Sequence, residues 1–168
     1  MRITVFGATG SVGGRVVAEA LARGHEVTAV ARDPAGHELP AAANPRAGDA
    51  ADVEDVVELS AGQDLVIAAT RPAPGDERGL VRTTKALLAG LAQTGVRLLV
   101  SGGAGSLTVP GAGGRTVMDD PNFLSLGTDE MLVDADGNST ISIEDLAVAL
   151  LDEAERPKHH QTRFTIAA

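Results

Sequence analysis

Hydrophobic positions in the first hundred residues follow two alternating spacings. Short runs rich in β-branched residues are typical of buried strands, and apolar residues three and four positions apart are typical of helices. The pattern predicts helices at residues 15–23, 52–61 and 77–94, and strands at residues 2–6, 26–31, 64–69 and 96–100, with a weak or short one near Ala47. Strands that alternate with helices predict an α/β fold, a parallel sheet with helices on both faces.

The pattern is less regular after about residue 105. A helix is expected from Ser142, its N-cap, to about Arg156, because a carboxylate follows the serine three residues later. A short strand is expected at residues 131–133, a turn at 134–137 and a final strand at 163–167. No linker separates a second domain, so residues 1–168 are predicted to form a single domain.

A glycine-rich segment, Gly7–Gly13, stands between the first strand and the first helix with the spacing Gly-x-x-Gly-x-x-Gly. In a Rossmann-type doubly wound sheet, the first glycine allows a sharp turn, the second a close approach to a pyrophosphate, and the third close packing of helix and strand. Backbone N–H groups at the helix start then hold the phosphates. The segment therefore predicts dinucleotide binding by Gly7, Thr9, Gly10, Ser11, Val12 and Gly13.

The end of the second strand selects between two dinucleotides. Arg32 favours NADP, because an arginine there accommodates a 2′-phosphate, whereas Asp33 would suit NAD or simply begin a turn. Asp49 ends the third strand and would either bond the adenine or cap the helix that begins near Asp52. The same edge is expected to place three small or polar residues and one arginine beside the cofactor: Ala50, Ala69, Thr70 and Arg71.

Several segments together resemble the short-chain dehydrogenase/reductase superfamily, and within it the atypical NmrA-like branch of NAD(P)H-binding proteins. The resemblance is carried by Ile3–Gly13, Ala31–Pro34, Gly48–Ala50, Gly102–Ser106 and the tail from Leu132 to Ala147. It implies a Rossmann fold, a nicotinamide cofactor and a reductase acting on small carbonyl compounds, quinones or flavins. Some members of the branch bind the cofactor without catalysis and act as redox sensors.

The chain departs from that superfamily in the residue that acts as the catalytic acid. The usual site pairs a serine with Tyr-x-x-x-Lys, whose lysine lowers the pKa of the tyrosine. This chain has no tyrosine, and Val81 and Ala154 stand four residues before its only lysines, Lys85 and Lys158. Ser106 loosely matches the catalytic serine and Ser101 is a rival, although either also fits a plain loop residue. Two hypotheses follow: an NADP-dependent reductase, or a non-catalytic NAD(P)-binding sensor.

A second departure lies near residues 124–127. In similar proteins this region continues into a further helix and strand, about 30 residues, whereas here it runs almost directly into the tail. Three explanations for the shorter region stay open. The unit was lost naturally, it was deleted deliberately, or it is a disordered segment that is missing from the sequence, with the later residues renumbered. In the last case we expect a mobile substrate lid between Pro121 and Gly127.

Composition restricts the partners. The net charge of −9 argues against a protein that binds nucleic acid or an anionic membrane through its overall charge. The absence of cysteine excludes disulfides and thiol catalysis. The sequence shows no targeting segment, so a cytoplasmic protein is expected. The acidic stretch Asp134–Asn138 resembles a calcium loop but has Ser139 where a glycine is required, so a turn is favoured and no metal is expected. The expected partner is a small-molecule substrate or electron acceptor, with homodimer formation left open.

Overall fold

The computed structural model describes residues 1–73, 76–103, 113, 141–164 and 166. These residues belong to two compact units, Met1–Ser101 and Gly102–Ala168. The sheet and the loops at its carboxyl edge lie in the first unit, whereas the second unit contributes one described helix. The prediction of a single domain stays a prediction.

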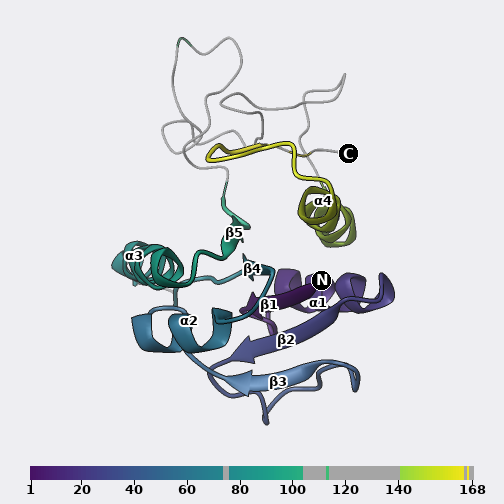
Figure 1. The fold of residues 1–168 in the computed structure, drawn as a ribbon, viewed down its shortest axis with the longest axis horizontal. Coiled ribbons are helices and arrows are strands. Elements are labelled where there is room, and N and C mark those ends of the chain that lie inside the picture. Colours follow the sequence, from purple (N-terminus) through teal and green to yellow (C-terminus); the bar gives the residue numbers. More distant parts are fainter. Residues whose placement is uncertain (74–75, 104–112, 114–140, 165, 167–168) are drawn as a thin grey trace. The chain divides into compact units, whose positions relative to one another are not determined.

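The first unit is built on a five-stranded sheet whose neighbouring strands all pair in parallel (Figure 1). The strand order is β3-β2-β1-β4-β5. The strands are β1 (Arg2–Phe6), β2 (Glu26–Ala31), β3 (Asn44–Ala47), β4 (Leu65–Ala68) and β5 (Arg97–Val100). The chain order of strands and helices is the predicted one, and the third strand is short, as Pro45 suggested. Because a proline cannot donate to a ladder, β3 fits the sheet edge that it occupies.

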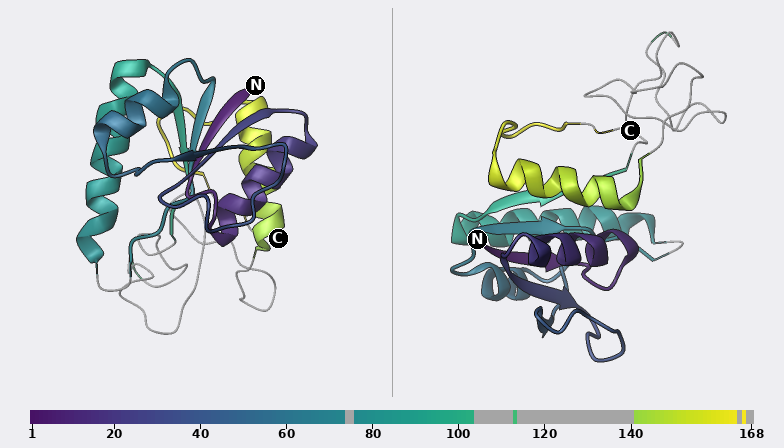
Figure 2. Two further views of the ribbon diagram at one scale, coloured as in Figure 1. Left: turned by 90° about the horizontal axis from the view of Figure 1, so that it is seen from below. Right: turned by 90° about the vertical axis from the view of Figure 1, so that its right-hand side faces the viewer.

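Helices cover both faces of this sheet (Figures 1 and 2). Helix α1 (Ser11–Ala22) contacts β1 and β2 on one face, and α2 (Val53–Ser60) and α3 (Glu77–Thr94) pack side by side on the other. Buried Phe6, Val30, Val56, Leu87 and Leu91 join the second face to its two helices. The predicted Rossmann-type doubly wound parallel sheet is therefore confirmed.

Two helix boundaries show how glycine acts here. Helix α1 begins at Ser11 rather than near residue 15, so the predicted start was four residues too late. Gly13 and Gly14 lie inside the helix although glycine is a poor helix former, because packing overrides propensity. By contrast, Gly95 closes α3 in the left-handed region, at φ +71°, as its place after the apolar stripe predicted.

A carboxylate ties the start of the sheet to the turn before β4. The backbone N–H of Arg2 donates to Asp64 Oδ2 at 2.6 Å, and Arg2 Nη2 donates to Oδ1 at 3.2 Å. The backbone hydrogen bond, followed by the one from the guanidinium, lowers the pKa of Asp64. Ionised Asp64 is thus favoured in the folded chain over the unfolded one.

Replacing Asp64 by asparagine is expected to destabilise the fold at neutral pH and to have little effect in acid. A depressed pKa contributes stability that is present above the unfolded value, about 3.9 for aspartate, and that is lost as the pH falls through the folded value. Urea unfolding of the native chain and Asp64→Asn between pH 7 and pH 3 should therefore show a gap that closes below about pH 4. A gap that stays constant over this range would contradict the assigned role.

The second unit contains α4 (Ile143–Glu155), and its predicted cap is confirmed. Ser142 Oγ accepts from the backbone N–H of Asp145 at 2.9 Å and donates to Asp145 Oδ2 at 2.6 Å. The predicted final strand is wrong at the residues described, because Arg163 and Phe164 have no strand pairing. Instead, the ring of Phe164 stacks on that of His159, 4.6 Å between centroids, a local contact that sequence alternation does not reveal.

Several predictions fall outside the described residues. These are the short strand at 131–133, the turn at 134–137 with its calcium-like spacing, and the shortened region near 124–127.

Candidate nucleotide-binding site

The predicted site residues follow different strands but gather at one edge of the sheet. Gly7 follows β1, Arg32 follows β2, Asp49 lies two residues after β3, and Ala69 follows β4. Because these four strands are parallel neighbours, their carboxyl ends meet at the same edge. That edge is where doubly wound folds bind ligands.

The turn after β1 is held against both neighbouring strands. The N–H groups of Gly7 and Ala8 both donate to the carbonyl of Val30, each at 3.1 Å. Gly7 has φ +81°, and a Cβ at this position would lie 2.5 Å from the carbonyl oxygen of Ala69. Only glycine combines this backbone conformation with so close an approach. The predicted role of the first glycine, a sharp turn, is therefore visible in the geometry.

The third glycine of the motif allows α1 to pack against this turn. A Cβ at Gly13 would lie 2.1 Å from the carbonyl oxygen of Gly7 and 3.1 Å from the Cα of Ala8. Real Cβ atoms essentially never come as close as 2.1 Å to another heavy atom. At Gly14 the nearest atom to such a Cβ, the carbonyl oxygen of Ala8, would be 3.5 Å away, an ordinary contact. The requirement for glycine therefore lies at Gly13 and not at its neighbour.

The first turn of α1 is open toward an anion. Gly10 is the N-cap, no side chain caps the helix, and no acidic residue stands in its first turn. The first intrahelical bond is donated by Gly14 to the carbonyl of Gly10 at 2.8 Å. The N–H groups of residues 11–13 consequently have no carbonyl partner within the helix. Together with the positive end of the helix dipole they suit phosphate oxygens.

Arg32 and Asp33 behave differently after β2. Asp33 Oδ1 accepts from the N–H of Gly36 at 3.2 Å, so its carboxylate stabilises a local turn. Arg32 is exposed and forms no ion pair with any residue that the structure describes. The turn-forming alternative for Asp33 is thus observed, while the guanidinium of Arg32 is available to a ligand.

Asp49 also takes part in a local turn. Its Oδ1 accepts from the N–H of Ala51 at 2.9 Å, and its own N–H donates to Asp55 Oδ2 at 2.8 Å. The cap of α2 is Asp52, which accepts from the N–H groups of residues 54 and 55 at 2.8 and 3.2 Å. The alternative that Asp49 caps α2 is therefore wrong, and its contact with adenine stays a prediction. Ala50, beside it, is buried.

The end of β4 joins the turn after β1. The N–H of Ala69 donates to the carbonyl of Phe6 at 2.9 Å, and Thr70 is half-buried beside it. Arg71 is exposed. Ser101, at the end of β5, is half-buried and donates its N–H to the carbonyl of Ala68 at 2.9 Å. Ser106, the predicted catalytic residue, lies outside the described residues.

Cations without an ion-pair partner are concentrated near this edge. In the described part of the first unit they are Arg32 after β2, Arg71 after β4, and Arg78 and Lys85 in the first turns of α3. The cations at the opposite edge pair with carboxylates, as Arg2 does with Asp64 and Arg23 with Glu19. In a chain of net charge −9, this arrangement favours an anionic ligand at the carboxyl edge.

The two α3 cations were missed by the sequence analysis. The apolar stripe of α3 identified a core helix, and its outward positions were not assigned a role. A signal was present, since Arg78, Arg82 and Lys85 recur at helical spacing in the first turns after β4. It was not used because the facing loop, at Ala51, belongs to a distant part of the sequence.

A family of proteins described as NAD(P)H-binding matches residues 7–123, which include the glycine segment and all five loops discussed above. The chain belongs to this NAD(P)H-binding family. The matched residues make up most of the first unit. The dinucleotide predicted from the glycine spacing is therefore, in this family, a nicotinamide cofactor.

Similar proteins are found in several bacteria. The Bacillus subtilis protein YwnB, which is uncharacterised, is 33% identical over 218 residues that include 100% of this chain and 99% of its own. A candidate epimerase from Bacteroides thetaiotaomicron is 32% identical and superposes with a TM-score of 0.87 over 99% of this chain and 96% of its own. A candidate NADH-flavin reductase from Streptococcus pneumoniae, 24% identical, has the same fold, with a TM-score of 0.82 over 100% of both chains.

The residues at the carboxyl edge fit a dinucleotide of this family. The contacts of Gly7 and Gly13 leave the first turn of α1 close to the ends of β1 and β4, with its N–H groups uncapped. The small side chain of Ala69 leaves room over the sheet.

No helix within the described segments is long and apolar enough to cross a membrane.

Proposed function

We propose that this member of the NAD(P)H-binding family is an NADP(H)-dependent reductase of the NmrA-like branch, which passes hydride to a small carbonyl compound, quinone or flavin. The observation that carries the proposal is the open first turn of α1, placed beside Gly7 at the end of β1. No carboxylate in that turn would repel a pyrophosphate. Arg32, exposed at the end of the adjacent β2, supports the phosphorylated dinucleotide.

The chain's own residues have distinct parts in this proposal. The backbone of Gly10–Gly13 binds the pyrophosphate, Arg32 binds the 2′-phosphate, and Asp49 with Ala50 borders the adenine. Ala69, Thr70 and Arg71 border the nicotinamide half of the cofactor. When bound, the nicotinamide supplies a hydride. Because no tyrosine is present, water or the substrate supplies the proton, and Ser106 orients the acceptor.

The choice of dinucleotide is tested with two variants that differ in which charge they remove. If Arg32 binds the 2′-phosphate, Arg32→Gln should raise the Kd for NADPH about tenfold or more, since a charge-assisted hydrogen bond contributes about 1.5–3 kcal/mol. The Kd for NADH should hardly change. The control is Asp33→Asn, which should leave NADPH binding intact because Asp33 stabilises a turn. If Asp33→Asn instead weakens NADH binding and Arg32→Gln is silent, NAD is the cofactor.

Turnover is a separate question from binding. Calorimetric titration with NADPH and NADH, run beside NADPH oxidation in the presence of quinone, flavin and aldehyde acceptors, answers both. We expect micromolar binding of NADPH and oxidation with at least one class of acceptor. If neither dinucleotide binds, the proposal is wrong.

A sensor is the second candidate, and the sequence contains an observation that favours it. The chain has no tyrosine, and neither lysine follows a tyrosine at the spacing used by the superfamily. A protein that binds NADPH without turning over any acceptor would report the redox state of the nicotinamide pool to a partner. Tight NADPH binding with no oxidation across the acceptor panel would favour this function.

The prediction of an absent structural unit also has support. The alignment with the Bacillus subtilis protein extends over 218 residues, although this chain has 168. Residues of that protein therefore have no counterpart here.

A further inference from the structure

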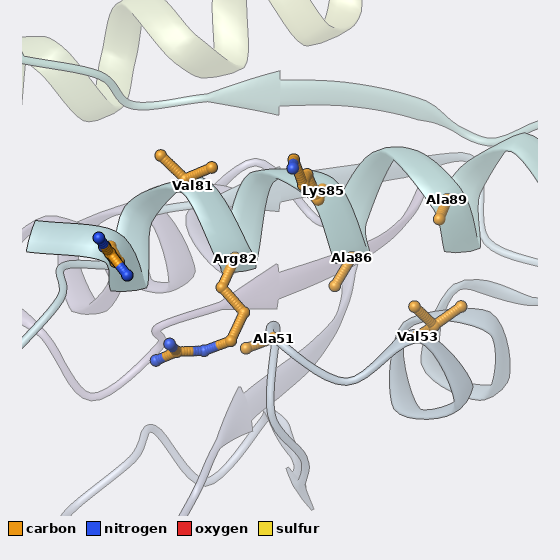
Figure 3. A pocket seen from close by; sticks show the side chains of 8 residues that line it. Ala51, Val53, Val81, Arg82, Lys85, Ala86 and Ala89 are labelled. Atoms are coloured by element: carbon orange, nitrogen blue, oxygen red, sulfur yellow. The ribbon is translucent and has the colours of Figure 1, made fainter. Parts of the chain in front are cut away.

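An open groove of about 650 Å³ lies between α3 and the loop that leads into α2 (Figure 3). Its floor is apolar, formed by the small or branched side chains of Ala51, Val53, Ala86 and Ala89, with Val81 at its upper border. Three cationic side chains complete the lining: Arg78, Arg82 and Lys85. All eight residues belong to the first unit.

The groove exists because the N-terminal part of α3 extends beyond the first turn of α2. Gly90 packs against the first turn of α2, where a Cβ would lie 2.6 Å from Val56 Cγ1 and 3.2 Å from the carbonyl oxygen of Val53. Residues 77–89 of α3 therefore precede that contact, about 20 Å of helix at 1.5 Å per residue. Figure 3 shows Ala51 opposite this leading part of α3 and Val53 opposite Ala89. The leading turns thus stand over the loop after β3, where Asp49 and Ala50 lie.

Arg82 is the cation directed toward that loop. In Figure 3 its side chain extends from α3 toward Ala51, whereas Val81 and Lys85 lie along the upper border of the same groove. Arg82 Nη2 donates to Asp76 Oδ2 at 2.7 Å. Asp76 is the N-cap residue of α3 but makes no side-chain cap bond, so its carboxylate holds the guanidinium instead. A guanidinium has five donors, and this pairing leaves others for a ligand.

The charge around the groove explains what such a cation would do. Asp49, Asp52 and Asp55 bring three carboxylates to the loop at the foot of the groove, each accepting a backbone N–H. An anion bound over this loop needs cations that offset these charges. Of the cations that line the groove, Arg78 and Lys85 form no ion pair within the described residues, and Arg82 has one carboxylate partner.

We propose that Arg82, positioned by Asp76, is a second specificity-determining residue for NADP(H) and binds the phosphate on the adenosine ribose from the α3 side. The inference rests on the proposed function and extends it, because Arg32 after β2 is the only residue that the sequence assigned to this phosphate. An apolar floor beside a cationic wall suits an adenosine whose ribose carries a phosphate. Arg78 and Lys85 add favourable potential without a directed contact.

Calorimetric titration with cofactor fragments tests this without any reaction. Adenosine 2′,5′-bisphosphate carries the additional phosphate, and AMP does not. We expect Arg82→Gln to raise the Kd for the bisphosphate about tenfold, as for the loss of a charge-assisted contact, and to change the Kd for AMP by less than about twofold. The ion pair that is lost is exposed on both sides, so the variant should fold normally, which its melting temperature checks.

The matched control is Arg23→Gln, which removes the same charge at the far end of α1, where Arg23 pairs with Glu19. It should leave both fragment affinities unchanged at the same ionic strength. An unchanged bisphosphate affinity in Arg82→Gln, or an equal loss for both fragments, would overturn the role of Arg82. Lys85→Gln provides a second measurement and should weaken bisphosphate binding less than Arg82→Gln does, because Lys85 adds only undirected potential. If the native chain binds NADPH but Arg82→Gln is silent, only this inference fails; if the native chain binds no dinucleotide, the proposed function fails with it.

Discussion

Gly13→Ala is expected to destabilise the protein by about 2–4 kcal/mol, whereas Gly14→Ala should stabilise it by about 0.5–1 kcal/mol. In both variants alanine replaces glycine within α1, so both gain the same helix propensity. They differ only in what the added methyl group meets. At Gly13 it would meet backbone atoms, 2.1 Å from the oxygen and 2.7 Å from the carbon of the Gly7 carbonyl. At Gly14 the nearest atom is 3.5 Å away.

Urea unfolding of the two variants beside the native chain measures this difference directly. Because Gly7 carries the turn at the end of β1, moving it to relieve the clash also disturbs its hydrogen bond to Val30. NADPH binding by Gly13→Ala should therefore weaken beyond detection even where the variant is folded, while Gly14→Ala should bind as the native chain does. Equal stabilities for the two variants would mean that α1 does not pack on the turn as described.

The first unit could be predicted from the sequence because local and global signals agree there. The β-branched runs at residues 2–6 and 26–31 match β1 and β2 to the residue, and the apolar stripe of 77–94 matches α3. Glycines at three-residue spacing then identified the turn after β1. The boundary of α1 was missed because glycine propensity favours a loop, and only the packing of Gly13 on Gly7 explains why the helix starts at Ser11.

The parts that could not be predicted depend on which of several possible contacts a side chain makes in the folded chain. Asp33 and Asp49 read as possible ligands for a nucleotide, yet both carboxylates accept N–H groups in their own turns. The role proposed for Arg82 depends on how far the N-terminal part of α3 extends beyond the first turn of α2. The packing of Gly90 on α2 sets this distance. Similarly, Phe164 stacks on His159 where the final strand was predicted to begin.

A carboxylate introduced at the start of α1 should separate folding from cofactor binding. Ser11→Asp places a negative charge in the first turn, where the helix dipole favours it by about 0.3–1 kcal/mol, so the variant should be at least as stable as the native chain. Ser11 is exposed, and neither its backbone nor its neighbours need to move. If phosphates bind at this turn, a carboxylate about 4 Å from them costs several kcal/mol even at an effective dielectric constant of 20.

The Kd for NADPH should therefore rise by about 100-fold or more in Ser11→Asp, equivalent to about 2.7 kcal/mol. The control is Ser11→Asn, which has the same shape without the charge and should lose much less affinity. The difference between the two variants should shrink at high salt, because screening weakens the repulsion between exposed charges. Equal affinities for the two variants would show that the pyrophosphate does not lie at the first turn of α1. The glycine segment would then be only a packing device, because the contacts of Gly7 and Gly13 are required for the turn whether or not a phosphate is bound.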